Sequence, residues 1–266
     1  MATFGEVVEV QRLTPRMVRV VLGGDGLVDF APTAWTDQYV NALFVPPDAP
    51  YTVPFDVDEA RRRPREQRPV GRRYTVRRWD PATRHLAIDF VVHGEVGVAG
   101  RWANRARPGD RLQVVGPTGR YAPDPAAGCH LMVGDESALP AIAASLERVP
   151  AGTPAVVVAI VDDADHEIEL DCPGDLDLTW VHRSHAHGDP DRLVRAVDAV
   201  DLPADRLQVF VHGEAGEVRS VRRHLLGVRG FTKDGTSISP YWRRDLTDER
   251  WRQVKADWLA ACEQDV

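Results

Sequence analysis

The chain has 266 residues, of which 43% are hydrophobic and 27% are charged, and its formal net charge is −7. This length suits one large domain or two of moderate size, and the composition is that of an ordinary globular protein, which excludes a disordered chain, a collagen-like repeat and a coiled coil. The negative charge argues against a nucleic-acid-binding protein, because binding phosphates needs a basic surface.

The cysteines and the first residues indicate where the protein works. Cys129, Cys172 and Cys262 lie far apart with no C-x-x-C pair, so they form neither a disulfide framework nor a four-thiolate zinc or iron–sulfur site. The first 20 residues alternate polar and apolar side chains, and no later stretch has the roughly 18 apolar residues that cross a membrane. We therefore expect a cytoplasmic protein with reduced thiols, no signal peptide and no membrane insertion.

The N-terminal part of the chain has the pattern of an all-β domain. Short segments of alternating polar and apolar residues are separated by Gly, Pro and Asp turns, and the clearest are residues 16–22, 39–44, 73–78, 86–92 and 111–115. One short helix is expected at residues 100–107. Several short strands at this spacing predict a small antiparallel barrel or sandwich over residues 1–122.

A linker with prolines and a glycine, residues 122–128, leads into a different pattern. Expected strands at 130–133, 154–161, 180–182 and 207–211 alternate with expected helices at 138–146, 191–200 and 214–226. Such alternation predicts a parallel sheet with helices on its faces, over residues 128–266. A last helix, residues 247–262, is expected to begin at a Thr247 cap and to place Trp251 and Trp258 on one face.

One segment of the barrel part is rich in arginine. Residues 61–78 hold nine arginines and a single acid, Glu66. This is a concentrated positive field in a protein of negative net charge. Two interpretations stay open at this point, a solvated surface segment and a surface that faces an anion.

Two strings in the barrel part bring chemistry-bearing residues together. Arg73, Tyr74 and Thr75 follow one another on an expected strand, so Tyr74 should lie on one face and Arg73 with Thr75 on the other. Such a trio offers a charge for a diphosphate, a ring for stacking and a hydroxyl donor. In the second string, HGEVGVAGRW at residues 93–102, glycines open a helix where backbone N–H groups can approach an anion. Each string alone also fits an ordinary strand or a capped turn.

Three further strings lie in the α/β part. GDESALPAI, residues 134–142, comes directly after the first strand of the parallel sheet, and open α/β sheets bind ligands at the carboxyl ends of their strands. VHGEA at residues 211–215 is another strand end with a glycine turn, and YWRR at residues 241–244 precedes the last helix. The G-x-G-x-x-G fingerprint is absent, so the residues alone leave a nucleotide site and plain turns both open.

Taken in order, these five strings resemble the siderophore-interacting protein family, ferric-siderophore reductases within the ferredoxin–NADP reductase superfamily. The family pattern has an R-x-Y-T-x-R strand, an H-G-x-x-G-P-A-x-x-W-A loop, P-G-D, G-D-E-T-A-L-P-A-I, a G-E-A strand end and a terminal Y-W-R, and it is matched across essentially the whole chain. The resemblance implies an N-terminal FAD-binding β-barrel followed by an NAD(P)H-binding α/β domain. The chain departs from the pattern at Val98, where proline is usual, and at Pro240 and Asp245, where glycine is common.

The resemblance also implies residue roles. Arg73 would pair with the FAD diphosphate, Tyr74 would lie against the isoalloxazine and Thr75 would hydrogen-bond near its N5, so Tyr74 and Thr75 are the expected catalytic residues. The rest of the FAD site would be lined by Val76, Asp89, Val91, His93, Gly97, Ala99, Gly100 and Trp102. The nicotinamide nucleotide would be held by Gly134, Asp135, Glu136, Ser137, Ala138, Gly213 and Glu214, with Tyr241 and Trp242 at the edge of the site.

The implied activity is the NAD(P)H-dependent, FAD-mediated reduction of ferric siderophores, with Fe(II) released in the cytoplasm. The protein would be a monomer with a small-molecule substrate and no resident metal, and the arginine-rich segment, together with Lys233, Arg243 and Lys255, would attract an anionic siderophore. Two alternatives are kept. The first is an NAD(P)H:flavin reductase or the reductase of an oxygenase on the same fold, and the second is a non-catalytic siderophore-binding protein.

Two features near residue 185 stay open. Arg183 follows an expected strand, where it can bind the 2′-phosphate of NADPH or pair with an acid of the sheet edge. His182, His185 and His187 lie close to Gly188, but their irregular spacing and the lack of a carboxylate or cysteine at matching intervals favour a solvated loop over a metal site.

Overall fold

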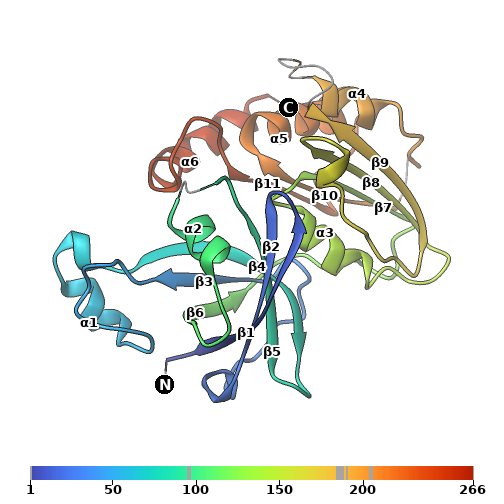
Figure 1. Cartoon of the computed structure of the whole chain (residues 1–266). Helices are drawn as coiled ribbons and strands as arrows, with labels where there is room; N and C mark the ends of the chain where they lie inside the picture. Colours follow the sequence, from blue (N-terminus) through green and yellow to red (C-terminus); the bar gives the residue numbers. More distant parts are fainter. Residues whose placement is uncertain (1, 95–96, 184–188, 190, 204–205, 266) are drawn as a thin grey trace. The chain divides into compact units, whose positions relative to one another are not determined.

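The chain divides into two compact units, residues 1–122 and residues 123–266. The computed structural model describes residues 2–94, 97–183, 189, 191–203 and 206–265, and Figure 1 shows its elements in chain order. Within the described residues, none of the helices combines the length and the apolar character needed to cross a membrane.

The first unit is a closed six-stranded barrel whose neighbouring strands are all antiparallel. Its strands, in the order β1-β2-β5-β4-β3-β6 around the barrel, are β1 Phe4–Thr14, β2 Met17–Gly23, β5 His85–Val91, β4 Val70–Asp80, β3 Tyr39–Phe44 and β6 Arg111–Thr118. Helices α1 (Val57–Arg62) and α2 (Val98–Arg105) lie in the connections. Closure of the sheet leaves no unpaired strand edge, which explains why a barrel is preferred over an open sheet here.

Alternation along each strand builds the barrel core. In β5 the residues Leu86, Ile88 and Phe90 are fully buried, and they pack with inward residues of the other strands. The antiparallel barrel predicted from the sequence is therefore confirmed. The short helix expected at residues 100–107 begins two residues earlier, because Gly97 adopts a positive φ of 77° and starts α2 at Val98.

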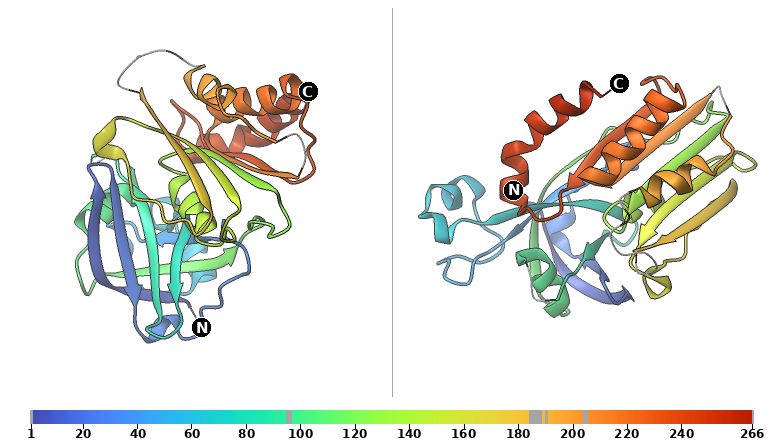
Figure 2. Two further views of the ribbon diagram at one scale, coloured as in Figure 1. Left: turned by 90° about the vertical axis from the view of Figure 1, so that its right-hand side faces the viewer. Right: turned by 90° about the horizontal axis from the view of Figure 1, so that it is seen from above.

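The second unit is a five-stranded parallel sheet in the order β11-β10-β7-β8-β9. Its strands are β7 Cys129–Asp135, β8 Pro154–Val161, β9 Asp175–His182, β10 Leu207–Glu214 and β11 Thr236–Trp242, and its helices are α3 Leu139–Leu146, α4 Arg192–Asp198, α5 Ala215–Arg222 and α6 Asp248–Glu263. Helices α4 and α5 cover one face of this sheet and α3 the other (Figures 1 and 2). Strands β7 and β8 are buried along nearly their whole length because both faces are covered.

The parallel sheet and the last helix are confirmed, with two differences. The predicted helix at 214–226 is α-helical only to Arg222 and continues as a wider π-helical turn, Arg223–Val228. Strand β11 was not predicted, and it contains Pro240. A proline is tolerated there because β11 is the outermost strand of the sheet and only one of its sides pairs.

Helix α6 is fixed to α5 by charged groups. The guanidinium of Arg219 donates to both oxygens of Asp265 at 2.6 and 2.8 Å, and Arg222 donates to the Cys262 carbonyl at 2.6 Å. The predicted Thr247 cap is present, since the Thr247 hydroxyl accepts from the Arg250 N–H at 3.3 Å.

Candidate functional site

In the barrel unit, the ring of Tyr74 lies on an aromatic row. Tyr74 packs on the ring of Phe90 with 4.3 Å between centroids, Phe90 packs on Trp102 at 5.8 Å, and Trp102 meets Phe44 at 5.8 Å. Tyr74 is half-buried against the barrel core. Phe90 therefore fixes the orientation of the Tyr74 ring on the side of the barrel core, while part of the ring stays accessible for a planar ligand.

The strand alternation predicted for β4 is present. Tyr74 pairs with the fully buried Val40 of β3, whereas Thr75 pairs with Tyr39 on the opposite face. The side chain of Arg73 is exposed, and its guanidinium lies 5.7 Å from the Tyr39 ring centroid. Arg73 and Thr75 thus share one face of β4 and Tyr74 lies on the other.

Arg72 is a residue that the sequence analysis passed over. It pairs with the fully buried Ala42 of β3, so it lies on the Tyr74 face of β4, two residues before the ring. The signal was available, because the R-x-Y-T spacing of the family pattern counts back from Tyr74 to Arg72. Val76 also lies on this face, but its side chain is part of the barrel core and is only 2% exposed.

The loop before α2 places backbone donors beside this row. Gly97 precedes the helix at φ 77° and, in the part of the chain that is described, no side chain caps the first turn of α2. Ala99 and Gly100 are buried, and a Cβ on Gly100 would lie 3.5 Å from the Cα of Val92. The helix start therefore packs directly on the end of β5, while Gly97 and His93 are exposed.

Asp89 and Val91, which the resemblance places in the FAD site, make contacts within the barrel itself. The carboxylate of Asp89 is fully buried and receives two hydrogen bonds from Arg19, at 2.6 and 2.8 Å. Val91 pairs with Met17 of β2. Asp89 alternates with Phe90, so its side chain lies on the opposite face from the aromatic row.

In the α/β unit, Asp135 organises the carboxyl ends of the strands. One of its oxygens accepts from the backbone N–H and the hydroxyl of Ser137, at 2.9 and 2.5 Å. The other accepts from the Glu214 N–H at 2.9 Å and from the Trp242 indole N–H at 2.7 Å. Asp135 is 1% exposed and joins the ends of β7, β10 and β11, so its role is to position the other groups.

The two glycines of this edge are required by close packing. A Cβ on Gly134 would lie 2.5 Å from the Cβ of Ala138, which is itself fully buried, and 2.8 Å from the His212 carbonyl oxygen. Gly213 has a φ of 136°, and a Cβ there would lie within 2.9 Å of the Asp135 carboxylate. Glu214 caps α5 by accepting from the N–H groups of Gly216 and Glu217, at 2.6 and 3.1 Å.

Arg183 is engaged by acids of the same edge. Its Nη1 donates to both oxygens of Glu136, at 2.6 and 2.9 Å, and to Asp162 at 3.3 Å. Burial raises the pKa of Glu136, and the neighbouring Arg183 opposes that rise. Of the two interpretations of Arg183, the structure shows the pairing with acids.

Glu217 is the most perturbed acid of the cluster. Burial, followed by the repulsion of Asp135, raises its pKa to about 7. The Arg183 and Arg244 guanidinium groups lie 3.9 and 3.5 Å from its Oε1, and within the described residues its buried Oε2 lacks a hydrogen-bond partner. This carboxyl therefore changes charge close to neutral pH.

Tyr241 and Trp242 end β11 beside the same edge. The Tyr241 ring packs on the buried His212 ring at 4.7 Å, and His212 packs on Phe210 at 4.1 Å. Burial lowers the pKa of His212 to about 3, so this imidazole is neutral at physiological pH. His182 contacts Glu167 at 2.7 Å, whereas His185, His187 and Gly188 lie outside the described residues.

The barrel groups fit a flavin dinucleotide. A half-exposed ring on a rigid aromatic row suits a planar heterocycle, while Arg72 and the uncapped start of α2 offer positive charge and N–H donors to a diphosphate. No single one of these features would be specific. Their concentration on one strand and one helix start supports the fit.

Comparison with known proteins identifies the family. Residues 6–121 match the model of the siderophore-interacting FAD-binding domain, and residues 127–245 match that of the siderophore-interacting protein. The chain belongs to the siderophore-interacting protein family. The resemblance inferred from the sequence is thereby confirmed, and the barrel unit is the FAD-binding domain of this family.

Two relatives that match over nearly the whole chain are named as reductases. The chain is 32% identical to the ferric vibriobactin reductase ViuB of Vibrio cholerae over 93% of its length and 96% of that protein. It is 34% identical to an NADPH-dependent ferric-chelate reductase of Escherichia coli, over 89% and 91% of the two chains. The crystal structure of a siderophore utilization protein from T. fusca aligns with a TM-score of 0.78 and 37% identity, over 93% and 95% of the two chains.

Proposed function

We propose that this protein reduces ferric siderophores with electrons from NAD(P)H, through FAD, and so releases Fe(II) in the cytoplasm. The observation that carries the proposal is the arrangement of Tyr74, Arg72 and the α2 start, within a domain whose family binds FAD. The reductase names of relatives that match over nearly the whole chain support the same activity.

FAD, when bound, supplies the conversion between a donor of two electrons and an acceptor of one, and the protein supplies position and electrostatics. Tyr74, supported by Phe90, would hold the flavin ring plane. Thr75 would offer its hydroxyl to a ring nitrogen, although its side chain is 9% exposed and lies on the other face of β4. Arg72 and the first N–H groups of α2 would bind the diphosphate, with Arg73 as the second arginine.

In the α/β unit, the strand ends would bind the nicotinamide nucleotide. Asp135 keeps the turns after β7 and β10 and the end of β11 in fixed relation. Because Gly134 and Gly213 have no room for a side chain, backbone groups form this edge. Recognition would thus rest on backbone groups and on Ser137 and Glu136 at the rim.

Iron release requires no protein ligand to the metal. Siderophores hold Fe(III) through hard oxygen donors, which bind Fe(II) far more weakly, so a single electron weakens the complex. The chain's contribution to substrate binding would be electrostatic. Arg62, Arg65, Arg68 and Arg78 of the arginine-rich segment are exposed and would attract an anionic complex.

The test is a spectroscopic titration of the full-length protein reconstituted with FAD. Under anaerobic conditions NADH or NADPH should bleach the flavin absorbance, and adding a ferric siderophore should restore it while an Fe(II)-specific chelator traps the released iron. Tyr74→Ala should weaken FAD retention, and Ala82→Ser in the exposed β4–β5 turn is the control. If the flavin absorbance returned only on addition of free flavin or of a one-electron protein acceptor, and not with a ferric siderophore, the protein would be a flavin reductase or the reductase of an oxygenase. Protein that takes up no FAD would leave a siderophore-binding role.

A further inference from the structure

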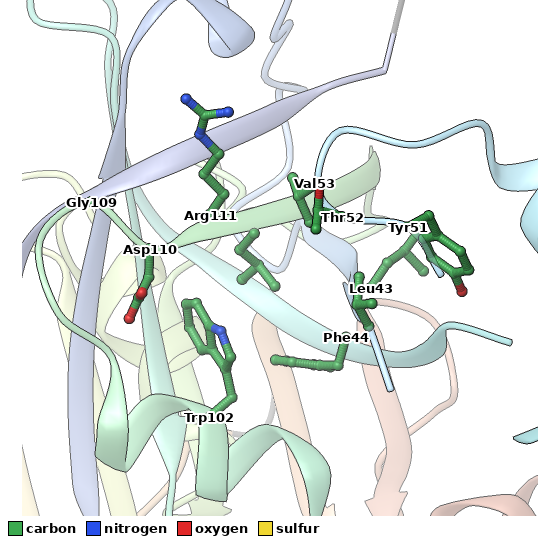
Figure 3. Close-up of a pocket in the computed structure, with 11 residues that line it drawn as sticks. Leu43, Phe44, Tyr51, Thr52, Val53, Trp102, Gly109, Asp110 and Arg111 are labelled. Carbon is green, nitrogen blue, oxygen red and sulfur yellow. The ribbon is translucent and has the colours of Figure 1, made fainter. Parts of the chain in front are cut away.

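The cavity of the barrel unit belongs to the site already described. It has a volume of about 430 Å³, and Figure 3 shows Phe44 and Trp102, two rings of the aromatic row, among the side chains that line it. The α/β unit, by contrast, has charged groups whose effect on the choice of nucleotide the proposed function leaves open. We call them the sheet-edge charge cluster, and they are Glu136, Asp162, Glu217 and Arg183.

Three members of the sheet-edge charge cluster are the first residues after three neighbouring strands. Glu136 follows β7, Asp162 follows β8 and Arg183 follows β9. The register keeps these strand ends nearly level, since the last residue of β7 pairs with the second-last residue of β8, and the last residues of β8 and β9 pair with each other. The three charged side chains therefore meet at the carboxyl edge of the sheet, which is where open α/β sheets bind their ligands.

The acids of the cluster occupy the guanidinium of Arg183. Its Nη1 donates to both oxygens of Glu136 and to Asp162, and its Nε lies 3.9 Å from Glu217 Oε1. Its Nη2 is buried. An arginine binds a phosphate best through two parallel N–H groups. Because Arg183 has one nitrogen bound to carboxylates and another buried, it does not present such a pair to a ligand.

Negative charge exceeds positive charge at this edge. Two more buried acids, Asp135 and Glu214, lie beside the cluster, and Arg244 lies 3.5 Å from Glu217. These five carboxyls stand against two guanidinium groups. The electrostatics agree, because burial, followed by the repulsion of Asp135, raises the pKa of Glu217 to about 7. The edge therefore resists a further negative charge.

NADH and NADPH differ at one place, the 2′ position of the adenosine ribose, which has a hydroxyl in NADH and a phosphate in NADPH. In dinucleotide-binding sheets, an acid roughly 20 residues beyond the phosphate-binding turn accepts from this hydroxyl. Asp162 follows the turn at residues 134–138 by a comparable stretch of sequence and ends the neighbouring strand. We infer that Asp162 and Glu136 make this protein select NADH over NADPH.

The two carboxylates act on the two nucleotides in opposite ways. They accept hydrogen bonds from the ribose hydroxyls of NADH, whereas the 2′-phosphate of NADPH, with a charge near −2, meets them as a like charge. The guanidinium that could compensate this repulsion, Arg183, is already bound to the same acids. Selection against NADPH thus comes from a repulsive group as well as from new hydrogen bonds.

The inference rests on the proposed function in that the sheet edge must bind the nucleotide, and the experiment separates the two. In the full-length protein reconstituted with FAD, kcat/KM is measured for NADH and for NADPH with one ferric chelate as acceptor. Calorimetry of the same protein compares AMP with 2′-phospho-AMP, which differ only in the 2′-phosphate and transfer no hydride. The variants are Asp162→Asn and Glu136→Gln, and the control is Asp177→Asn, which neutralises an exposed acid of β9.

The wild-type kcat/KM should be about tenfold or more higher for NADH than for NADPH, and AMP should bind more tightly than 2′-phospho-AMP. Asp162→Asn and Glu136→Gln should each lower the NADH-to-NADPH ratio about three- to tenfold, because NADPH gains affinity, and Asp177→Asn should leave the ratio unchanged. A purely structural role would weaken both nucleotides alike.

Three results would overturn the selection of NADH and leave the reductase activity intact. They are a wild-type kcat/KM for NADPH that equals or exceeds that for NADH, binding of 2′-phospho-AMP as tight as that of AMP, and a ratio that stays unchanged in both acid variants. If the wild-type protein oxidised neither nucleotide, the proposed function itself would be overturned.

Discussion

The two units present their candidate site residues in opposite ways. On the barrel, Arg73 is exposed and Tyr74 half-exposed, and the start of α2 has backbone donors that no described side chain caps. At the sheet edge, Asp135 and Glu214 are buried and bind neighbouring backbone groups, and Glu136 binds Arg183. The motif residues of the two units therefore differ in what they do in the structure. Those of the barrel leave a ring, a guanidinium and backbone N–H groups accessible, whereas those of the sheet edge hold neighbouring backbone groups in place.

The largest effect is expected from Asp135, which lies at the centre of the hydrogen bonds of the sheet edge. Asp135→Ala should lower the free energy of unfolding by about 3 kcal/mol or more, because four donors in a buried region lose their acceptor. Nicotinamide nucleotide binding should be lost as well, and FAD binding should persist. Urea unfolding and separate titrations of FAD and NADPH measure both effects.

Two controls fix the interpretation of the Asp135 change. Asp135→Asn keeps one acceptor oxygen and should cost about half as much. Asp80→Ala removes a half-buried aspartate that also accepts two turn hydrogen bonds, from the Ala82 N–H and the Thr83 hydroxyl, and it should lower the free energy of unfolding much less than Asp135→Ala does. If Asp135→Ala lost nucleotide binding with unchanged stability, Asp135 would be a direct ligand and not a scaffold residue.

The second prediction concerns the pH dependence of stability. Burial raises the pKa of Glu217 from 4.5 to about 7 in the folded chain. Between these values the folded state holds a proton that the unfolded state releases, so stability should fall as pH rises from about 4.5 to about 7, by up to about 3 kcal/mol. The urea midpoint should change less steeply with pH across this window in Glu217→Gln than in the wild-type chain. The exposed Glu169→Gln is the control, and a slope that stays the same in both variants would contradict the assignment.

The fold could be predicted where a segment's own pattern determines its structure. β5 reads His85-Leu86-Ala87-Ile88-Asp89-Phe90-Val91, and its alternation alone places Leu86, Ile88 and Phe90 in a core. β8 is a continuous apolar run, as a strand covered on both faces requires. β11 could not be predicted in this way. It contains polar residues and Pro240, and it is a strand because β10 offers a free side for pairing.

In the candidate site, too, the features that depend on one segment could be predicted and those that join distant segments could not. Tyr74 and its face of β4 followed from alternation, and the same alternation would have identified Arg72 had the count started at the ring. The Arg183–Glu136 pair could not be found, because 47 residues separate its members. Glu136 follows β7 and Arg183 follows β9, and the two side chains meet across the end of β8, which lies between these strands. The ring contact between Phe44 of β3 and Trp102 of α2 likewise joins two elements that are distant in the sequence.

A third experiment asks which arginine of β4 binds the diphosphate. Arg72→Gln should weaken FAD binding by about tenfold, because a charge-assisted hydrogen bond contributes roughly 1.5–3 kcal/mol and part of it is retained by the amide. Arg73→Gln should have a smaller effect, since its side chain is exposed on the opposite face. Both variants remove one positive charge, so a difference between their FAD affinities shows which of the two side chains lies at the diphosphate. The reverse order would favour the role that the resemblance implied for Arg73.

The smallest effect is expected from the arginine-rich segment, and the structure changes which residues should be replaced. Arg61 lies 3.6 Å from Asp58, and Arg63 pairs with Glu59 at 2.9 Å while its guanidinium lies over the Tyr51 ring. Replacing these would disturb α1 and the packing of the Tyr51 ring as well as the charge. Arg62 and Arg65 are exposed and serve the test better.

The double variant Arg62→Gln/Arg65→Gln should raise the apparent KM for an anionic ferric chelate about two- to threefold at low ionic strength, with kcat unchanged, because long-range attraction acts on encounter. The effect should disappear at about 1 M salt, where screening shortens the Debye length to about 3 Å, and should be absent for a neutral chelate. The matched control Arg107→Gln/Arg120→Gln removes the same charge from exposed positions elsewhere on the barrel. An equal rise in KM in both double variants would show that net charge alone attracts the substrate, and the arginine-rich segment would then have no role as a distinct recognition surface.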